Sequence, residues 1–180
     1  GIRRAARGPV IPTASGRAIL CDCGANADCT PEYLLQFAYL GSFYTKRLMG
    51  LENPRVGLLN IGAEPSKGDS LRHETFQLLE EAGREGRLNF IGNVEANTAL
   101  LGGADVIVAD GYSGNILLKG VEGCAKRAEK GAPFQHEKQA GRSAGQRQPA
   151  GHEKAAGPQR DRRYAVPWHQ QAGAEGSRLL

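Results

Sequence analysis

The chain has 180 residues, of which 40% are hydrophobic, and this is enough for one domain with a buried core. Its charge is uneven, because residues 1–123 carry 12 basic against 14 acidic side chains, whereas residues 124–180 carry 11 against 5. No apolar run approaches the roughly 20 residues needed to span a bilayer, and no secretory signal follows the basic first residues. From the sequence we therefore expect a cytoplasmic protein.

A strand and a helix are the first elements that the sequence predicts. Residues 10–12 suggest an extended entry segment, and residues 18–21 form a short apolar run typical of a buried strand. Thr30 can cap a helix that has proline at its first position. Apolar residues then recur at helical spacing over residues 31–49, and Gly50 ends the helix.

The same alternation continues along the chain. Further strands are predicted at residues 55–60, 88–92 and 105–110. Further helices are predicted from Ser70 to Gly83 or Gly86, as one or two turns over residues 96–101, and from Gly114 to about Lys130. Because the strands are apolar throughout, both faces of their sheet must be covered. The sequence thus predicts an α/β fold with a doubly wound, mainly parallel sheet in three αβα layers.

The last part of the sequence differs from the rest. From Cys124 onward, the only Val, Ile, Leu, Met or Phe residues are Phe134, Val166, Leu179 and Leu180. Such a segment cannot bury enough apolar area to offset the entropy of ordering it. We therefore expect a domain over residues 1–130 and a disordered basic tail over residues 131–180. A basic tail can bind nucleic acid or anionic lipid, but we expect no nucleic acid partner.

Polar loops follow the carboxyl ends of the predicted strands, which is where ligands bind in such sheets. They contain four side chains able to position a ligand through hydrogen bonds, namely Asn26, Asn60, Asn93 and Asp110. Lys67 is the only lysine in these loops and could pair with a phosphate as a point charge, or it could simply be solvated. Ser113, Gly114 and Asn115 would present hydrogen-bond donors to an anion if a helix begins there, or they form a plain helix cap.

Several other kinds of site have little support. Lys67 precedes the second glycine of its loop, so the loop is not a Walker A motif, and no G-x-G-x-x-G motif follows a strand. No Ser-His-Asp or Cys-His set is apparent. Cys21, Cys23 and Cys29 could form a zinc site, but no second half with ligand spacing accompanies them. We expect free thiols, with Cys21 and Cys23 packed as small hydrophobic residues.

Five segments, taken in order, are similar to one known family. They are Asp22 to Cys29 (DCGANADC), Asn53 to Gly62 (NPRVGLLNIG), Lys67-Gly68, Phe90 to Glu95 (FIGNVE), and Ala104 to Lys119 (ADVIVADGYSGNILLK). With these residues the chain resembles the acyl-acyl carrier protein:phosphate acyltransferases. The resemblance implies a fold like that of isocitrate and isopropylmalate dehydrogenases, which phosphotransacetylases also share.

The resemblance also implies an activity and its partners. The acyl donor would be acyl carrier protein and the acceptor inorganic phosphate, and the acyl phosphate formed would enter phosphatidic acid synthesis. The family implies a cytoplasmic homodimer, in peripheral association with the membrane and with its glycerol-phosphate acyltransferase, and no metal or cofactor. We assign Lys67, Asp110 and Asn115 to catalysis. Substrate and phosphate binding falls to Asn26, Asn60, Asn93, Ser113 and Gly114.

The chain departs from the family at both ends. The family's first units would precede Gly1, and the resemblance stops after Gly123 together with the change in composition. We interpret this as a reading-frame shift or a gene-end artefact near residues 124–130, and we expect the chain by itself to be almost inactive and prone to aggregate. Two alternatives stay open: a phosphotransacetylase-like enzyme that uses acyl-coenzyme A, and an inactive fragment.

Overall fold

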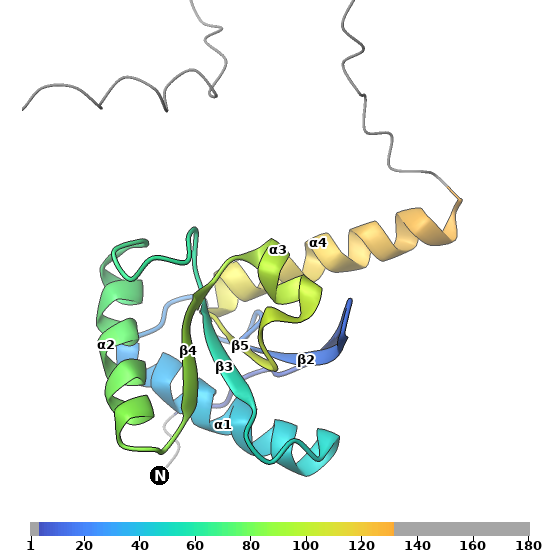
Figure 1. The fold of residues 1–180 in the computed structure, drawn as a ribbon. Helices are drawn as coiled ribbons and strands as arrows, with labels where there is room; N and C mark the ends of the chain where they lie inside the picture. Colours follow the sequence, from blue (N-terminus) through green and yellow to red (C-terminus); the bar gives the residue numbers. More distant parts are fainter. Residues whose placement is uncertain (1–3, 132–180) are drawn as a thin grey trace, which may run out of the picture. The chain divides into compact units, whose positions relative to one another are not determined.

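A computed structural model describes residues 4–131 of the chain, and these residues form a single sheet with helices on both faces (Figure 1). The strands are β1 (Val10–Thr13), β2 (Gly16–Cys21), β3 (Arg55–Leu59), β4 (Asn89–Val94) and β5 (Val106–Val108). The helices are α1 (Pro31–Met49), α2 (Ser70–Arg84), α3 (Ala96–Thr98), η1 (Ala99–Gly103) and α4 (Gly111–Glu129). The predicted tail over residues 131–180 lies, apart from its first residue, outside the described residues.

The strands lie in the order β1-β2-β5-β3-β4, and β2, β5, β3 and β4 run parallel. This confirms the predicted mainly parallel α/β sheet. The extended entry segment proves to be the edge strand β1, which pairs antiparallel with β2 through a tight turn between Thr13 and Gly16. A two-residue turn can join only antiparallel neighbours, whereas each parallel pair needs a crossover helix.

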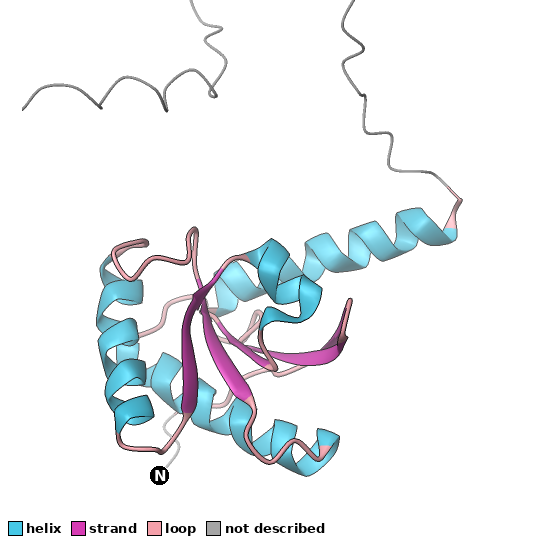
Figure 2. Cartoon of the chain, viewed as in Figure 1, coloured by secondary structure: helices cyan, strands magenta, loops and turns pink. Residues whose placement is uncertain are grey.

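Helices cover both faces of the sheet, which gives three layers (Figure 2). Alternate strand residues such as Ile19, Val56 and Val106 pack against α1 and α2 in one buried cluster. The intervening residues, such as Leu20 and Ile107, pack in a second cluster with η1 and α4. Because side chains alternate across a strand, an uninterrupted apolar run supplies both clusters at once.

Helix α1 begins and ends where the sequence predicts. Thr30 has extended backbone angles and precedes Pro31, but its side chain makes no capping hydrogen bond. Gly50 adopts the left-handed conformation with φ of 70° and its N–H donates to the carbonyl of Lys46, as expected for a helix-ending glycine. No helix within residues 4–131 is long and apolar enough to cross a membrane.

Strand β4 contains a bulge that the sequence did not reveal. Its register against β3 shifts, so that Val56 faces Phe90 whereas Leu58 faces Asn93. Gly92 lies within this shift with φ of 96°, a conformation that glycine adopts at little cost. The bulge therefore lengthens the predicted strand and turns Asn93 into the protein, where it is 6% exposed.

Candidate functional site

The carboxyl ends of β2, β5 and β3 meet at one edge of the sheet because these strands are parallel neighbours. Asp22 follows β2, Asn60 follows β3 and Asp110 follows β5, so three of the predicted polar loops lie side by side. The amide N–H of Asp22 donates to the carbonyl of Ala109 at 2.9 Å, which joins the first and last of these loops directly.

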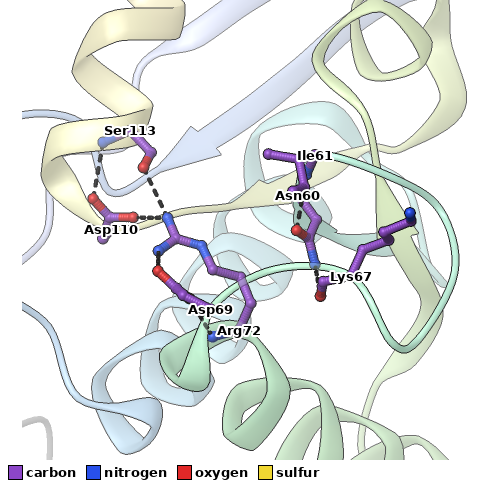
Figure 3. A network of polar contacts seen from close by, with 7 residues as sticks. All are labelled: Asn60, Ile61, Lys67, Asp69, Arg72, Asp110 and Ser113. Atoms are coloured by element: carbon purple, nitrogen blue, oxygen red, sulfur yellow. Dashed lines mark hydrogen bonds and ion pairs between the residues drawn. The ribbon is translucent and has the colours of Figure 1, made fainter. Parts of the chain in front are cut away.

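Arg72, in the first turn of α2, is the centre of this edge (Figure 3). Its Nη2 atom donates to Ser113 Oγ at 2.8 Å and forms a close ion pair with Asp110, and both partners belong to the start of α4. Its Nη1 atom donates to Asp69 Oδ2 at 2.9 Å. One guanidinium group thus connects the beginnings of two helices that follow different strands.

Asp110 is the amino-terminal cap of α4, and its Oδ1 atom accepts a hydrogen bond from the Ser113 amide at 2.8 Å. Burial alone would raise the pKa of this carboxyl group. The hydrogen bonds from Ser113 and the charge and hydrogen bond of Arg72 outweigh that effect and hold the pKa below its ordinary value of 3.8. Asp110 is therefore ionised at neutral pH, and it accepts hydrogen bonds but cannot donate one.

Helix α4 begins at Gly111, three residues before the predicted start. The amides of Ser113 and Gly114 are consequently engaged with Asp110 inside the first turn, through its side chain and its carbonyl oxygen. The Ser113 side chain still lies at the groove described below. The shift has a simple cause, since an acidic cap followed by glycine has the sequence of a turn as well as that of a helix start.

A groove of about 1200 Å³ opens beside this network. Its apolar wall runs along α4 through Ile116, Leu117, Val121 and Ala125. The facing wall includes Pro12, Leu59 and Leu100, from β1, β3 and η1. Asn60, Asp69, Arg72 and Ser113 form its polar end. The arrangement can hold a ligand with a charged group at one end and an apolar body.

Asn60 and Lys67 belong to one loop. The Asn60 side chain accepts from the Ile61 amide at 2.8 Å and donates to the Lys67 carbonyl at 2.9 Å, so it fixes the loop across its base. The Lys67 side chain is exposed, does not line the groove, and points away from Arg72 (Figure 3). The backbone of Lys67, rather than its ammonium group, is what this structure ties to the site.

The other predicted asparagines also hold loops in place. Asn93 Nδ2 donates to the Glu64 carbonyl at 2.8 Å, and its Oδ1 atom is buried with no hydrogen-bond partner among the described residues. Asn26 Nδ2 donates to the carbonyl of Ala5 and to the buried carboxylate of Asp22, and the Asn26 carbonyl accepts from the Gly111 amide.

The start of α4 packs so closely on the loop after β2 that only glycine fits there. A Cβ atom at Gly114 would lie 1.9 Å from the Asp22 carbonyl oxygen. Asn115 lies beside Gly24 of the same loop and, like Asn26, does not line the groove. Of the predicted site residues, Ser113 and Asn60 line the groove and Asp110 lies behind it. The other predicted residues do not line the groove and belong to the surrounding loops and the start of α4.

The sequence did not single out Arg72, although it lies in a predicted helix. Its partners Asp110 and Ser113 are 38 and 41 residues away in the chain, so only the folded arrangement brings them together. A usable signal was present, because an arginine in the first turn of a helix after a strand-end loop must lie near the ligand-binding edge of a parallel sheet.

Cys21 and Cys23 are buried and Cys29 is half-buried, all as free thiols. Burial, with Asp22 and the neighbouring thiols as smaller contributions, raises the pKa of Cys21 to about 12, so it packs as a neutral side chain. Within residues 4–131, no group of three or more histidine, cysteine or acidic side chains is arranged to hold a metal ion.

The fold defined by these elements is shared with a solved structure. It is similar to a phosphotransacetylase from Streptococcus pyogenes, with a TM-score of 0.55 and 21% identity over 70% of this chain and 43% of that one. The amino-acid sequence shows the protein family. The chain belongs to the fatty acid synthesis protein family, whose profile matches residues 1–140.

Relatives within the family carry the name phosphate acyltransferase, which confirms the resemblance predicted from the sequence. The one from Bacillus licheniformis is 53% identical over 126 residues, which are 69% of this chain and 37% of that protein. One from Staphylococcus aureus is 47% identical over 131 residues, 72% of this chain and 39% of that protein. The chain therefore spans less than two fifths of the length of these relatives.

Proposed function

We propose that this chain forms part of the site of a phosphate acyltransferase, at which an acyl group passes from the thioester of acyl carrier protein to inorganic phosphate. The observation that carries the proposal is the groove. It joins a long apolar wall to a polar end containing Arg72 and Ser113, in a chain whose relatives carry the name phosphate acyltransferase. An acyl chain suits the wall, and an anion suits the polar end.

The reaction would proceed by attack of a phosphate oxygen on the thioester carbonyl carbon. A carbon–oxygen bond forms, the carbon–sulfur bond breaks, and the departing thiolate takes up a proton, giving acyl phosphate and the free thiol. The protein must orient an anionic nucleophile and stabilise the oxyanion that forms on the carbonyl oxygen. Neither task requires a covalent enzyme nucleophile or a cofactor.

The residues at the site suit these tasks. Asp110, held ionised behind the groove, would act by fixing the Arg72 guanidinium group and the start of α4 beside the phosphate. The Ser113 hydroxyl lies at the groove and would contact the phosphate or the oxyanion. Lys67 would add positive charge from the neighbouring loop, and Asn115 with Gly114 would keep the start of α4 against the loop after β2.

The remaining asparagines would act by supporting the loops around the phosphate. Asn60 and Asn93 fasten the loop between β3 and α2 at two points, through Lys67 and Glu64. Asn26 fastens the loop after β2 to Gly111 at the start of α4. The setting that we propose follows from the family resemblance: phosphatidic acid synthesis in the cytoplasm, by a homodimer that works beside a membrane glycerol-phosphate acyltransferase.

A chimaera tests the proposal directly. The 126 matched residues of the Bacillus licheniformis relative would be replaced by those of this chain, and acyl phosphate would be trapped as the hydroxamate. We expect turnover with acyl carrier protein thioester and inorganic phosphate. Acyl-coenzyme A is the comparison donor, and a preference for it would favour the phosphotransacetylase-like alternative. A folded chimaera that uses neither donor would refute both.

A further inference from the structure

Among residues 4–131, Arg72 is the only positively charged residue that lines the groove. Its side chain is 14% exposed, so most of the guanidinium group is enclosed by protein while one edge meets the groove. Lys67, the lysine of the neighbouring loop, is exposed and lies outside the groove. A cation at the polar end of an otherwise apolar groove is placed to receive the charged end of a ligand.

The two acidic partners of Arg72 differ in how firmly they are held. The Asp110 side chain is 6% exposed and is fixed by the Ser113 amide, so its ion pair with Nη2 is enclosed. The Asp69 side chain is 59% exposed, and its pairing with Nη1 faces solvent. An exposed ion pair contributes little to stability, and its partners separate readily in water. Breaking an enclosed pair is costly, because it leaves a buried charge without a partner.

The geometry leads us to propose that Arg72 binds the anionic substrate, and that Asp69 occupies the binding edge of the guanidinium group until the anion displaces it. This inference rests on the proposed function, in which that anion is inorganic phosphate. Asp110 and Ser113 hold the Nη2 edge in place. The Nη1 edge then pairs with a phosphate oxygen where it now pairs with Asp69 Oδ2.

Charge and donor count agree with this assignment. Arg72 and Asp110 together are neutral, so Asp69 adds a net negative charge that opposes the approach of an anion. The side chain has five N–H donors, and the bonds to Asp69, Asp110 and Ser113 occupy three of them. Release of Asp69 leaves three donors for phosphate, and a planar guanidinium group binds phosphate through two of them at once.

The test is a calorimetric titration of the 180-residue chain with inorganic phosphate at constant ionic strength. Arg72→Gln removes the charge and the fork of donors, and we expect its affinity for phosphate to fall at least about tenfold. Arg72→Lys keeps the charge but loses the fork, so we expect a smaller loss. Arg55→Gln is the control, because Arg55 also pairs with an aspartate, Asp105, but at the beginning of β3 and away from the groove.

Asp69→Asn gives a change of the opposite sign, which misfolding cannot imitate. Asparagine retains the capping oxygen for the Arg72 amide but loses the competing charge. We expect phosphate to bind about fivefold more tightly, as removal of one charge at about 4 Å in a water-like medium implies. Equal affinity in the wild type, Arg72→Gln and Asp69→Asn would overturn the inference and leave the proposed function standing. If the wild-type chain binds no phosphate, the inference is refuted, and the chimaera alone decides the proposed function.

Discussion

The Asp110 carboxylate shows how a single residue can hold both the start of a helix and an ion pair. One of its oxygens caps α4 and the other pairs with Arg72, while the side chain is almost fully enclosed. Because these contacts favour the ionised form more than burial disfavours it, the group is kept as an acceptor at neutral pH. The same contacts make the stability of the protein depend on pH.

The first prediction concerns that dependence. The pKa of Asp110 is lowered on folding, so its contribution to stability is complete above the unfolded value of about 4 and is lost as pH falls through the folded value. In Asp110→Asn this contribution is absent at every pH. We expect the Tm of this variant, measured by circular dichroism, to fall less steeply between about pH 5 and pH 3 than the Tm of the wild type. Parallel curves would contradict the coupling to Arg72.

The second prediction concerns the ammonium group of Lys67. Asn60 binds the backbone carbonyl of Lys67, so Lys67→Ala removes the charge and leaves the loop fastened. If the charge stabilises phosphate or the developing oxyanion, turnover of the chimaera should fall roughly a hundredfold, as for loss of one preorganised donor. Lys46→Ala, on exposed α1 surface, is the control and should leave turnover unchanged. Near-normal turnover in Lys67→Ala would remove Lys67 from the site.

Among the elements, α4 shows most clearly what a sequence can predict. Its existence, as a helix from Gly114 to about Lys130, followed from the sequence. Its first residue did not, because Asp110 and Gly111 suit a turn as well as a helix start. The bulge at Gly92 likewise depends on the pairing of β4 with β3, and local sequence does not encode that pairing. Because of the bulge, Asn93 faces inward.

The third prediction tests the close packing of α4. Gly114→Ala would place a methyl group against the Asp22 carbonyl, so α4 or the loop after β2 must move. We expect a loss of about 2 kcal/mol or more in the free energy of unfolding, measured by urea denaturation. Gly123→Ala is the matched control on the same helix. No atom lies within 4 Å of its added Cβ, so we expect it to stabilise the protein by up to about 1 kcal/mol.

At the scale of the whole molecule, the groove is made from segments that are remote in sequence. Pro12, Asn60, Arg72, Leu100 and Ser113 come from five parts of the chain. Sequence patterns predicted the parallel sheet and therefore the edge at which Asn60 and Asp110 meet. They could not predict Arg72 as the centre of the network, since that depends on the direction in which α2 leaves its loop.

The fourth prediction follows from where the core lies. Both buried clusters and every strand described here fall within residues 4–131. The stability of this unit should then come from its own burial of apolar side chains. We expect a chain cut after Gln135 to unfold cooperatively, with a Tm within about 4 °C of the full chain, a difference below about 1 kcal/mol. It should also bind phosphate with the same affinity, because all groove residues are retained. A non-cooperative transition, or loss of phosphate binding, would show that residues 136–180 contribute to the folded unit.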